Sequence, residues 1–216
     1  MGYKTMDANE AVSRVSYKFT EIAGIYPITP ASPMAEQVDV LASKGEINFW
    51  GNKVKVIEME SEKGAIATVH GALQAGVLAT TYTASQGLLL MIPSIYKMAG
   101  EMLPGVIHVA ARSLSTHSLS IFGDHQDIYA VRQTGACMLS SSSVEEAYHM
   151  AMVSHLASIK SSLPFINFFD GFRTSHEIDK VKEIDLSKLE TLIDKKALRK
   201  FRDNGMISGA TTRGTC

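Results

Sequence analysis

Cysteine is almost absent from the sequence: its 216 residues include only two, Cys137 and Cys216. Two thiols cannot build a disulfide framework, and two thiolates are too few to hold an iron–sulfur cluster or a structural zinc ion by themselves. Cys137 lies in the apolar string ACML and is expected to pack in the core. This scarcity excludes a disulfide-stapled scaffold and any cluster that this chain's thiolates would bind alone.

A large excess of charge and long hydrophobic runs are also missing. The 21 basic and 22 acidic side chains leave a formal net charge of -1, so the composition offers no electrostatic footprint for nucleic acid or an anionic membrane. No apolar run is long enough to cross a bilayer, and the first residues lack the apolar core of a signal peptide. We therefore expect a cytoplasmic protein with neither a nucleic-acid nor a membrane partner.

Short β-branched or apolar segments alternate with helical ones along the chain, and several of the segments are apolar on both faces. This alternation predicts an α/β fold, a doubly wound and mainly parallel sheet with helices on both faces. In such a sheet the loops that follow the strands lie on one edge, where ligands bind. The loops expected there are YPITP, EMESE, TASQG, AARS, SSSS and FDGF.

The segment from Lys53 to Gly76 combines a predicted strand, a cluster of glutamates that ends at Glu62, and a helix rich in glycine and alanine. Glycine weakens helices, so its frequency here indicates close approach by another backbone or a flat ligand. A carboxylate between strand and helix is well placed to hold one proton. The alternative is an acidic first turn that complements the helix dipole, and spacing alone favours that alternative.

Two other strand ends carry candidate binding residues. Thr29 stands between Pro27 and Pro30, so its hydroxyl is held on a stiff loop, although the same loop would serve as a plain connection. Arg112 directly follows the apolar segment 105–111. Its planar guanidinium suits a small carboxylate in the crevice of the sheet, and the alternative for Arg112 is a surface ion pair.

Two polar clusters lie near these strand ends. The Ser85-Gln86-Gly87 turn has backbone N–H groups that an anion would accept, but it matches neither a Walker loop nor a GxGxxG motif, and a tight loop is the alternative. The string FGDHQD, residues 122–127, contains two aspartates around a histidine. Such a trio is able to bind a metal, but a hydrogen-bonded loop anchor is more common, and we favour the anchor.

Six strings together resemble the N-terminal domain of pyruvate:ferredoxin (or flavodoxin) oxidoreductase, over about residues 3–205. They are IYPITPASPMAE, EMESEKGA, TASQGLLLMIP, LPGVIHVAAR, SIFGDHQDIYA and FFDGFRTSHEI. The family depends on thiamine diphosphate, and the resemblance implies that residues 1–180 form its pyrimidine-binding domain. Residues 181–216 would then be a surface helix, predicted over 186–201, and a linker toward missing downstream domains.

The resemblance also implies roles for individual residues. Glu62 matches the carboxylate that hydrogen-bonds the aminopyrimidine ring, and a shielded carboxylate is able to share a proton with it. Arg112 and Thr29 match the groups that bind pyruvate, the first at its carboxylate and the second at an oxygen. Further candidate cofactor contacts are Pro27, Ser85 and Gln86.

Other parts of the family's machinery are not encoded in this sequence. It has no GDG motif with a downstream asparagine and no CxxC runs, so Mg2+ and [4Fe-4S] clusters are expected only on other domains. Coenzyme A and ferredoxin or flavodoxin would act through the full-length enzyme, a predicted homodimer, and this chain alone is expected to be inactive. The alternatives are an oxidoreductase domain for another 2-oxoacid, such as 2-oxoglutarate, and a non-catalytic binding or assembly module.

Overall fold

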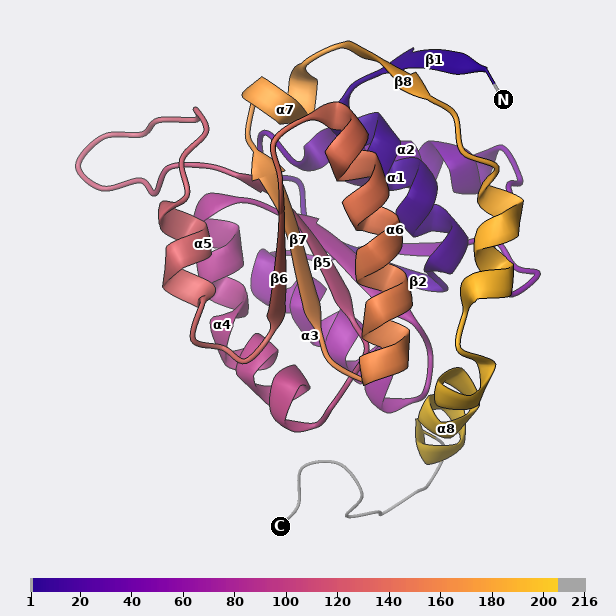
Figure 1. Cartoon of the computed structure of the whole chain (residues 1–216). Coiled ribbons are helices and arrows are strands. Elements are labelled where there is room, and N and C mark those ends of the chain that lie inside the picture. The colour runs from indigo at the N-terminus through magenta and orange to yellow at the C-terminus, as the bar shows by residue number, and fades with distance from the viewer. Residues whose placement is uncertain (1, 206–216) are drawn as a thin grey trace.

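Six parallel strands form one sheet in the computed structural model, which describes residues 2–205 (Figure 1). Their order across the sheet is β3-β2-β4-β5-β7-β6, and every neighbouring pair is parallel. The strands are β2 (Ile22–Ile25), β3 (Lys55–Glu58), β4 (Ala79–Thr83), β5 (Val106–Ala111), β6 (Cys137–Ser141) and β7 (Phe165–Asp170). All residues of β4 and β5 are buried, as expected for central strands covered on both faces.

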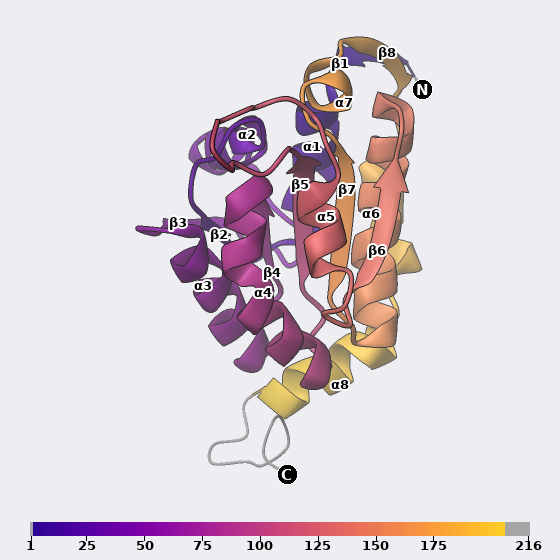
Figure 2. The same ribbon diagram turned by 90° about the vertical axis from the view of Figure 1, so that its left-hand side faces the viewer.

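Helices cover the sheet in two layers, which confirms the predicted doubly wound architecture (Figures 1 and 2). One layer contains α1 (Ala8–Phe19), α2 (Ser32–Ser43) and α6 (Val144–Ser161). The other contains α3 (Glu62–Gln74), α4 (Ser85–Gly100) and the short α5 (Gln126–Val131). Among residues 2–205, no helix combines the length and apolar character needed to span a membrane.

Hydroxyl and carboxylate side chains begin several of these helices. Asp7 accepts a hydrogen bond from the backbone N–H of Glu10 (2.8 Å) at the start of α1. Ser61 accepts from Gly64 (3.3 Å) at the start of α3. Each cap satisfies a helical N–H group that has no partner inside the helix, so the sequence itself fixes where these helices start.

The C-terminal part of the described chain differs from the prediction of one helix over 186–201. It contains a 3-10 helix, η1 (Leu186–Leu192), and then a separate α-helix, α8 (Lys195–Gly205). Asp194 lies between them, and its carboxylate accepts from the N–H of Ala197 (2.9 Å) and starts a new helix. The predicted linker from 206 onward lies outside the described residues.

A second, two-stranded sheet joins distant parts of the chain: β1 (Tyr3–Met6) pairs antiparallel with β8 (Asp179–Lys182). The two strands lie together above α1 and α6 in Figure 1, followed along the chain by η1 and α8. The segment after residue 178 is therefore hydrogen-bonded to the first residues of the chain.

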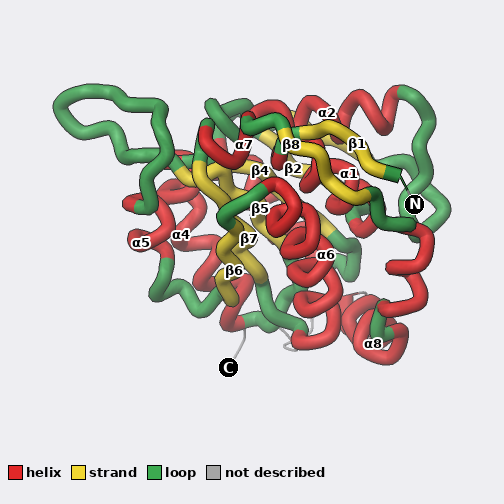
Figure 3. Tube along the Cα trace, turned by 45° about the horizontal axis from the view of Figure 1, so that its top comes forward, coloured by secondary structure: helices red, strands yellow, loops and turns green. Residues whose placement is uncertain are grey.

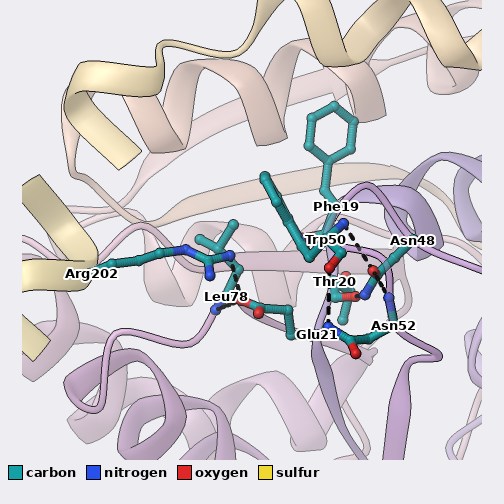
Figure 4. Close-up of polar contacts among 8 residues, drawn as sticks. All are labelled: Phe19, Thr20, Glu21, Asn48, Trp50, Asn52, Leu78 and Arg202. Carbon is teal, nitrogen blue, oxygen red and sulfur yellow. Dashed lines mark hydrogen bonds and ion pairs between the residues drawn. The ribbon is translucent and has the colours of Figure 1, made fainter. Parts of the chain in front are cut away.

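Helix α8 is fixed at the amino ends of the strands (Figure 4). The Arg202 guanidinium pairs with Glu21 (Nη2 to Oε2, 3.1 Å), which also accepts from the backbone N–H of Leu78 (2.9 Å). The same guanidinium stacks over the Trp50 ring, 5.0 Å from its centroid. Trp50 in turn donates from Nε1 to the carbonyl oxygen of Phe19 (3.0 Å). This network ties α8 to the turns before β2 and β4.

A buried histidine pair fills the space between the sheet and α6. His108 on β5 and His155 on α6 approach through their Nε2 atoms (3.1 Å), and Nδ1 of His108 contacts the amide of Asn167 (3.1 Å). His155 also stacks on Phe19, with ring centroids 5.0 Å apart. Burial lowers the pKa of His155 to about 3 and lowers that of His108 well below its usual value, so both rings are neutral in the folded protein.

Candidate functional site

The site residues predicted from the sequence follow β2, β3, β4 and β5, at the carboxyl edge of the sheet. Helix α2 leaves β2 toward one face of the sheet, whereas α4 leaves the neighbouring β4 toward the other face (Figure 2). Such a reversal between adjacent parallel strands opens a crevice outside the sheet, which is where α/β folds bind ligands. Figure 3 shows the long loop that follows β5 extending from this edge of the molecule.

Glu62 is the first residue of α3, and only 7% of its surface is exposed. Its side chain lies against Gly87, in the first turn of α4. A Cβ atom at Gly87 would lie 2.6 Å from Cγ and 2.8 Å from Oε1 of Glu62, and 2.5 Å from Oγ1 of Thr83. The absence of a side chain at Gly87 is therefore what leaves room for the Glu62 carboxylate.

Arg112 directly follows β5, is also 7% exposed, and interacts electrostatically with Glu62. Its Nη1 donates to the carbonyl oxygen of Thr29 (2.7 Å), and its Nη2 makes a longer contact with Oε1 of Gln86 (3.5 Å). Burial lowers the pKa of Arg112, whereas Asp127 and Glu62 raise it. Because an arginine starts from so high a pKa, the guanidinium stays charged.

Ser85 and Gln86 form the first turn of α4 beside Arg112. Ser85 has a left-handed backbone, with φ of 50°, and donates its N–H to Asp127 (2.8 Å). Its hydroxyl contacts Oε1 of Gln86 (2.5 Å) and the carbonyl oxygen of Ser113 (2.6 Å). Ser85 is fully buried, and its N–H already donates to Asp127, so this N–H is not available to an anion from outside the chain. A cofactor contact by either residue stays a prediction.

Pro27 and Thr29 are the exposed members of the predicted set. The loop that carries them contains a cis peptide bond between Thr29 and Pro30, and the Pro30 carbonyl oxygen accepts from the side-chain amide of Asn9 on α1 (3.1 Å). The structure brings the backbone carbonyl of Thr29, rather than its hydroxyl, to Arg112. The predicted contacts of the Thr29 hydroxyl and of Pro27 with ligands stay predictions.

Three further residues shape the site, and sequence reasoning gave them no individual role: Thr83, Gly87 and Asp127. Asp127 does belong to the FGDHQD string, and its hydrogen bonds confirm that the string acts as an anchor. The signal for Gly87 was its place directly after a polar turn at a strand end. Thr83 looked like an ordinary strand residue, yet its hydroxyl is buried and has no hydrogen-bond partner within residues 2–205.

Comparison with known families finds a match over the part of the chain that forms this edge. The family described as pyruvate flavodoxin/ferredoxin oxidoreductase, thiamine diphosphate-binding, matches residues 14–214. The chain belongs to this family. The residues matched by the family thus include all the predicted site residues at the carboxyl ends of the strands.

Two longer relatives show how much of a related protein this chain covers. Pyruvate-flavodoxin oxidoreductase of Klebsiella pneumoniae is 60% identical over 203 residues, which are 94% of this chain and 17% of the relative. Pyruvate:ferredoxin oxidoreductase of Moorella thermoacetica is 56% identical over 206 residues, 95% of this chain and 18% of the relative. The chain therefore spans less than a fifth of these two relatives.

The fold has a counterpart among solved structures. A 2-oxoglutarate:ferredoxin oxidoreductase from Magnetococcus marinus, with 2-oxoglutarate, coenzyme A and succinyl-CoA bound, superimposes with a TM-score of 0.75 at 22% identity. The superposition covers 87% of this chain and 32% of that one. At this identity the likeness concerns the fold, and it agrees with the doubly wound sheet described above.

The residues present fit the thiamine diphosphate that the family binds. Glu62 offers a shielded carboxylate, and the missing side chain at Gly87 leaves room for it. Two buried polar atoms, Oγ1 of Thr83 and Nε of Arg112, have no hydrogen-bond partner within residues 2–205. Buried polar groups without partners are rare in folded proteins. Thr83 lies beside Gly87 together with Glu62, and Arg112 interacts electrostatically with Glu62.

Proposed function

We propose that this chain supplies the pyrimidine side of the thiamine diphosphate site in a pyruvate:ferredoxin or pyruvate:flavodoxin oxidoreductase. The reaction is oxidative decarboxylation of pyruvate with coenzyme A, which gives acetyl-CoA and CO2 and passes electrons to ferredoxin or flavodoxin. The observation that carries the proposal is a buried carboxylate, Glu62, beside a buried guanidinium, Arg112, at the switch point of a thiamine-family fold.

Glu62 holds and returns a proton at its carboxylate. Water has little access to this side chain, so a proton shared with a ring nitrogen is not lost to solvent. When bound, thiamine diphosphate supplies the nucleophilic carbon and the electron sink for decarboxylation. Gly87 keeps the carboxylate in line with the crevice, because a side chain there would displace it.

Arg112 binds the substrate carboxylate, and Thr29 donates its hydroxyl to a substrate oxygen. The contact of Arg112 with the Thr29 carbonyl orients the guanidinium before substrate arrives, so less ordering is needed on binding. Pro27, Ser85 and Gln86 complete the binding site around the cofactor, and Gln86 contacts Nη2 of the Arg112 guanidinium. Lysine would not replace Arg112, because the planar fork matches a carboxylate through two parallel hydrogen bonds.

The remaining functions are proposed for the rest of the enzyme. Another domain would bind Mg2+ and the diphosphate, and others would carry the [4Fe-4S] clusters. We further propose a homodimer of full-length chains in the cytoplasm. In the same scheme, residues 1–180 are the pyrimidine-binding domain, and residues 181–216 lead toward the other domains. Under this division of labour the isolated chain does not oxidise pyruvate.

We favour pyruvate over 2-oxoglutarate as the substrate of the full-length enzyme, because the relatives at 60% and 56% identity are named for pyruvate. The relative named for 2-oxoglutarate has 22% identity, which supports only the fold. A non-catalytic assembly module is the other alternative, and it requires no buried Glu62 at the crevice.

A chimeric enzyme tests the proposal. This chain replaces the matching 203 residues of the Klebsiella enzyme, and pyruvate oxidation is measured with coenzyme A and flavodoxin. Glu62→Gln should lower kcat at least about 100-fold, since a positioned acid–base group contributes roughly 10²- to 10⁴-fold. Glu60→Gln, at an exposed glutamate two residues away, is the matched control and should retain activity. Equal activity of the two variants would remove Glu62 from this role, and an inactive wild-type chimera would contradict the function itself.

A further inference from the structure

Asp127 is a fully buried carboxylate behind the site, near the start of α5. Its Oδ2 accepts two backbone hydrogen bonds, from the N–H of Ser85 (2.8 Å) and from the N–H of Arg112 (3.0 Å). Its Oδ1 accepts from the N–H of Ile128 (2.8 Å). One carboxylate thus binds the chain just after β4, just after β5 and at its own helix.

A buried carboxylate is costly unless several donors compensate it. Burial raises the pKa of Asp127, and the three backbone N–H groups from Arg112, Ser85 and Ile128 oppose that rise. Two of these donors belong to residues of the candidate site, since the side chain of Arg112 contacts Thr29 and Gln86, and Ser85 begins the turn with Gln86. An aspartate that served only its own helix would need neither of them.

The side chains held by this anchor are connected to one another. The Arg112 guanidinium reaches Gln86, and Gln86 is held by the Ser85 hydroxyl and by the Ser115 carbonyl oxygen, to which its Nε2 donates (2.9 Å). The backbone of Ser85 has a positive φ, which side-chain-bearing residues seldom adopt without support. Its hydrogen bond to Asp127 is such a support.

We propose that Asp127 is a positioning residue for substrate binding, which holds Arg112 and the Ser85-Gln86 turn in register through their backbones. This inference rests on the proposed function, because the substrate it positions is the 2-oxoacid bound by Arg112. Asp127 itself does not touch the substrate. It holds the backbone after β5, which carries Arg112, and the backbone after β4, which carries Ser85 and Gln86.

Hydrogen exchange on the 216-residue chain tests the anchor without any activity. In Asp127→Asn the amides of Ser85 and Arg112 should exchange about ten- to 100-fold faster than in the wild type, since a charged acceptor contributes more than a neutral one. The amide of Val109, in the middle of β5, reports global opening and serves as the internal reference. Asp124→Asn is the matched control, because exposed Asp124 accepts only from Gln126 (2.8 Å) in the same segment.

Unchanged exchange at both amides in Asp127→Asn would overturn the proposal. If that variant does not fold, Asp127→Ser keeps one oxygen acceptor near the same position and takes its place. Exchange that rises equally at Val109 would show a general loss of stability rather than a local anchor, and would also overturn the proposal.

Kinetics in the chimera separate positioning from a merely structural role. Asp127→Asn should raise the KM for pyruvate about tenfold and leave kcat within about threefold, because misplaced Arg112 weakens binding of substrate and transition state alike. Asp124→Asn should change neither constant. A loss of kcat at unchanged KM would overturn the positioning role. If the wild-type chimera is inactive, the proposed function fails, and the exchange measurement decides on the anchor by itself.

Discussion

The two ends of the strands treat their polar groups differently. At the amino ends, Asn48 donates to the Thr20 carbonyl oxygen (2.8 Å) and accepts from the N–H groups of Trp50 and Asn52 (3.0 Å each), as Figure 4 shows. At the carboxyl ends, the Thr83 hydroxyl and Nε of Arg112 are buried without partners within residues 2–205. Nε of Arg202 is a similar atom at the amino ends, and in both arginines other guanidinium nitrogens are bonded, in Arg202 to Glu21 and in Arg112 to Thr29 and Gln86. The Thr83 hydroxyl, by contrast, is the single polar atom of its side chain.

From this contrast we propose that the amino edge serves stability and that the carboxyl edge serves binding. A buried polar group without a partner costs about 1–3 kcal/mol, so it persists where something other than folding retains it. At the amino ends, Asn48 bonds to the Thr20 carbonyl oxygen, and Glu21 bonds to both Leu78 and Arg202. The ion pair of Glu21 with Arg202 holds α8 in place. In the proposed function, the unpartnered atoms at the carboxyl ends lie where a ligand would bind. Substitutions at the two edges should therefore affect different measurements.

The largest effect expected from the comparison is on activity at the carboxyl edge. In Gly87→Ala the new Cβ would meet Glu62 at 2.6 Å and Thr83 at 2.5 Å, so the carboxylate must move. Activity of the chimera should fall roughly 100-fold, the scale of an ångström-sized displacement of a catalytic group. Thermal unfolding should show a moderate loss of about 1–3 kcal/mol from overpacking.

Gly100→Ala is the control on the same helix, because a Cβ built there has no atom of residues 2–205 within 4 Å apart from its chain neighbours and the backbone of its own helix. It should leave activity unchanged and stability equal or slightly higher, since alanine is the better helix former. If Gly87→Ala retained full activity, the absence of a side chain at Gly87 would have no role in the site.

Much of this contrast follows from the sequence through topology. Alternating strands and helices predicted a parallel sheet, and a parallel sheet gathers its carboxyl ends on one edge. Thr29, Glu62 and Arg112 were expected there for that reason, and the structure brings them together. The resemblance assigned chemistry to them, which spacing alone would not have done.

Other features of the site could not be predicted from the sequence, because they depend on contacts between residues that are distant along the chain. The hydrogen bond from Arg112 to the Thr29 carbonyl spans 83 positions, and no local pattern distinguishes that carbonyl from the Thr29 hydroxyl. The left-handed Ser85 is stabilised from Asp127, 42 residues away. The start of α8 is capped by Asp194, and an amphipathic pattern does not reveal such a cap.

The pH dependence of stability tests the buried histidine pair, His108 and His155, which lies in the core between the two edges of the sheet. His155 has a pKa of about 3 in the folded protein against about 6.5 when unfolded, so the unfolded chain binds more protons between these values. The stabilisation is complete above pH 6.5 and is lost as the pH falls toward 3. At pH 5 this histidine alone should cost about 2 kcal/mol relative to pH 7. His108, whose pKa is also lowered, should add to the loss.

Urea unfolding at pH 7 and pH 5 measures this loss in the wild-type chain. His155→Phe should have a smaller difference between the two pH values, because one acid-sensitive group is gone and the ring is retained beside Phe19. His149→Phe on the same helix, at an exposed position, should keep the wild-type difference. If the two variants behaved alike, the acid sensitivity would have to come from elsewhere in the protein.

The smallest expected effect belongs to the amino edge and concerns stability alone. In Arg202→Ala the ion pair with Glu21 and the stacking on Trp50 are both lost. Because the Arg202 side chain is 39% exposed, the ion pair is partly screened. The two contacts together should contribute about 1–2 kcal/mol to the free energy of unfolding.

Arg199→Ala, at an exposed arginine on the same helix, should change stability by less than about 0.5 kcal/mol. A double-mutant cycle with Glu21→Gln then isolates the pair, and its coupling energy should be smaller than the effect of Arg202→Ala, since the Trp50 contact is outside the cycle. Chimeras with Arg202→Ala should keep the kcat and KM of the wild type. A change in KM would mean that the amino-end network reaches the crevice through the strands, and the separation of stability from binding along this sheet would not hold.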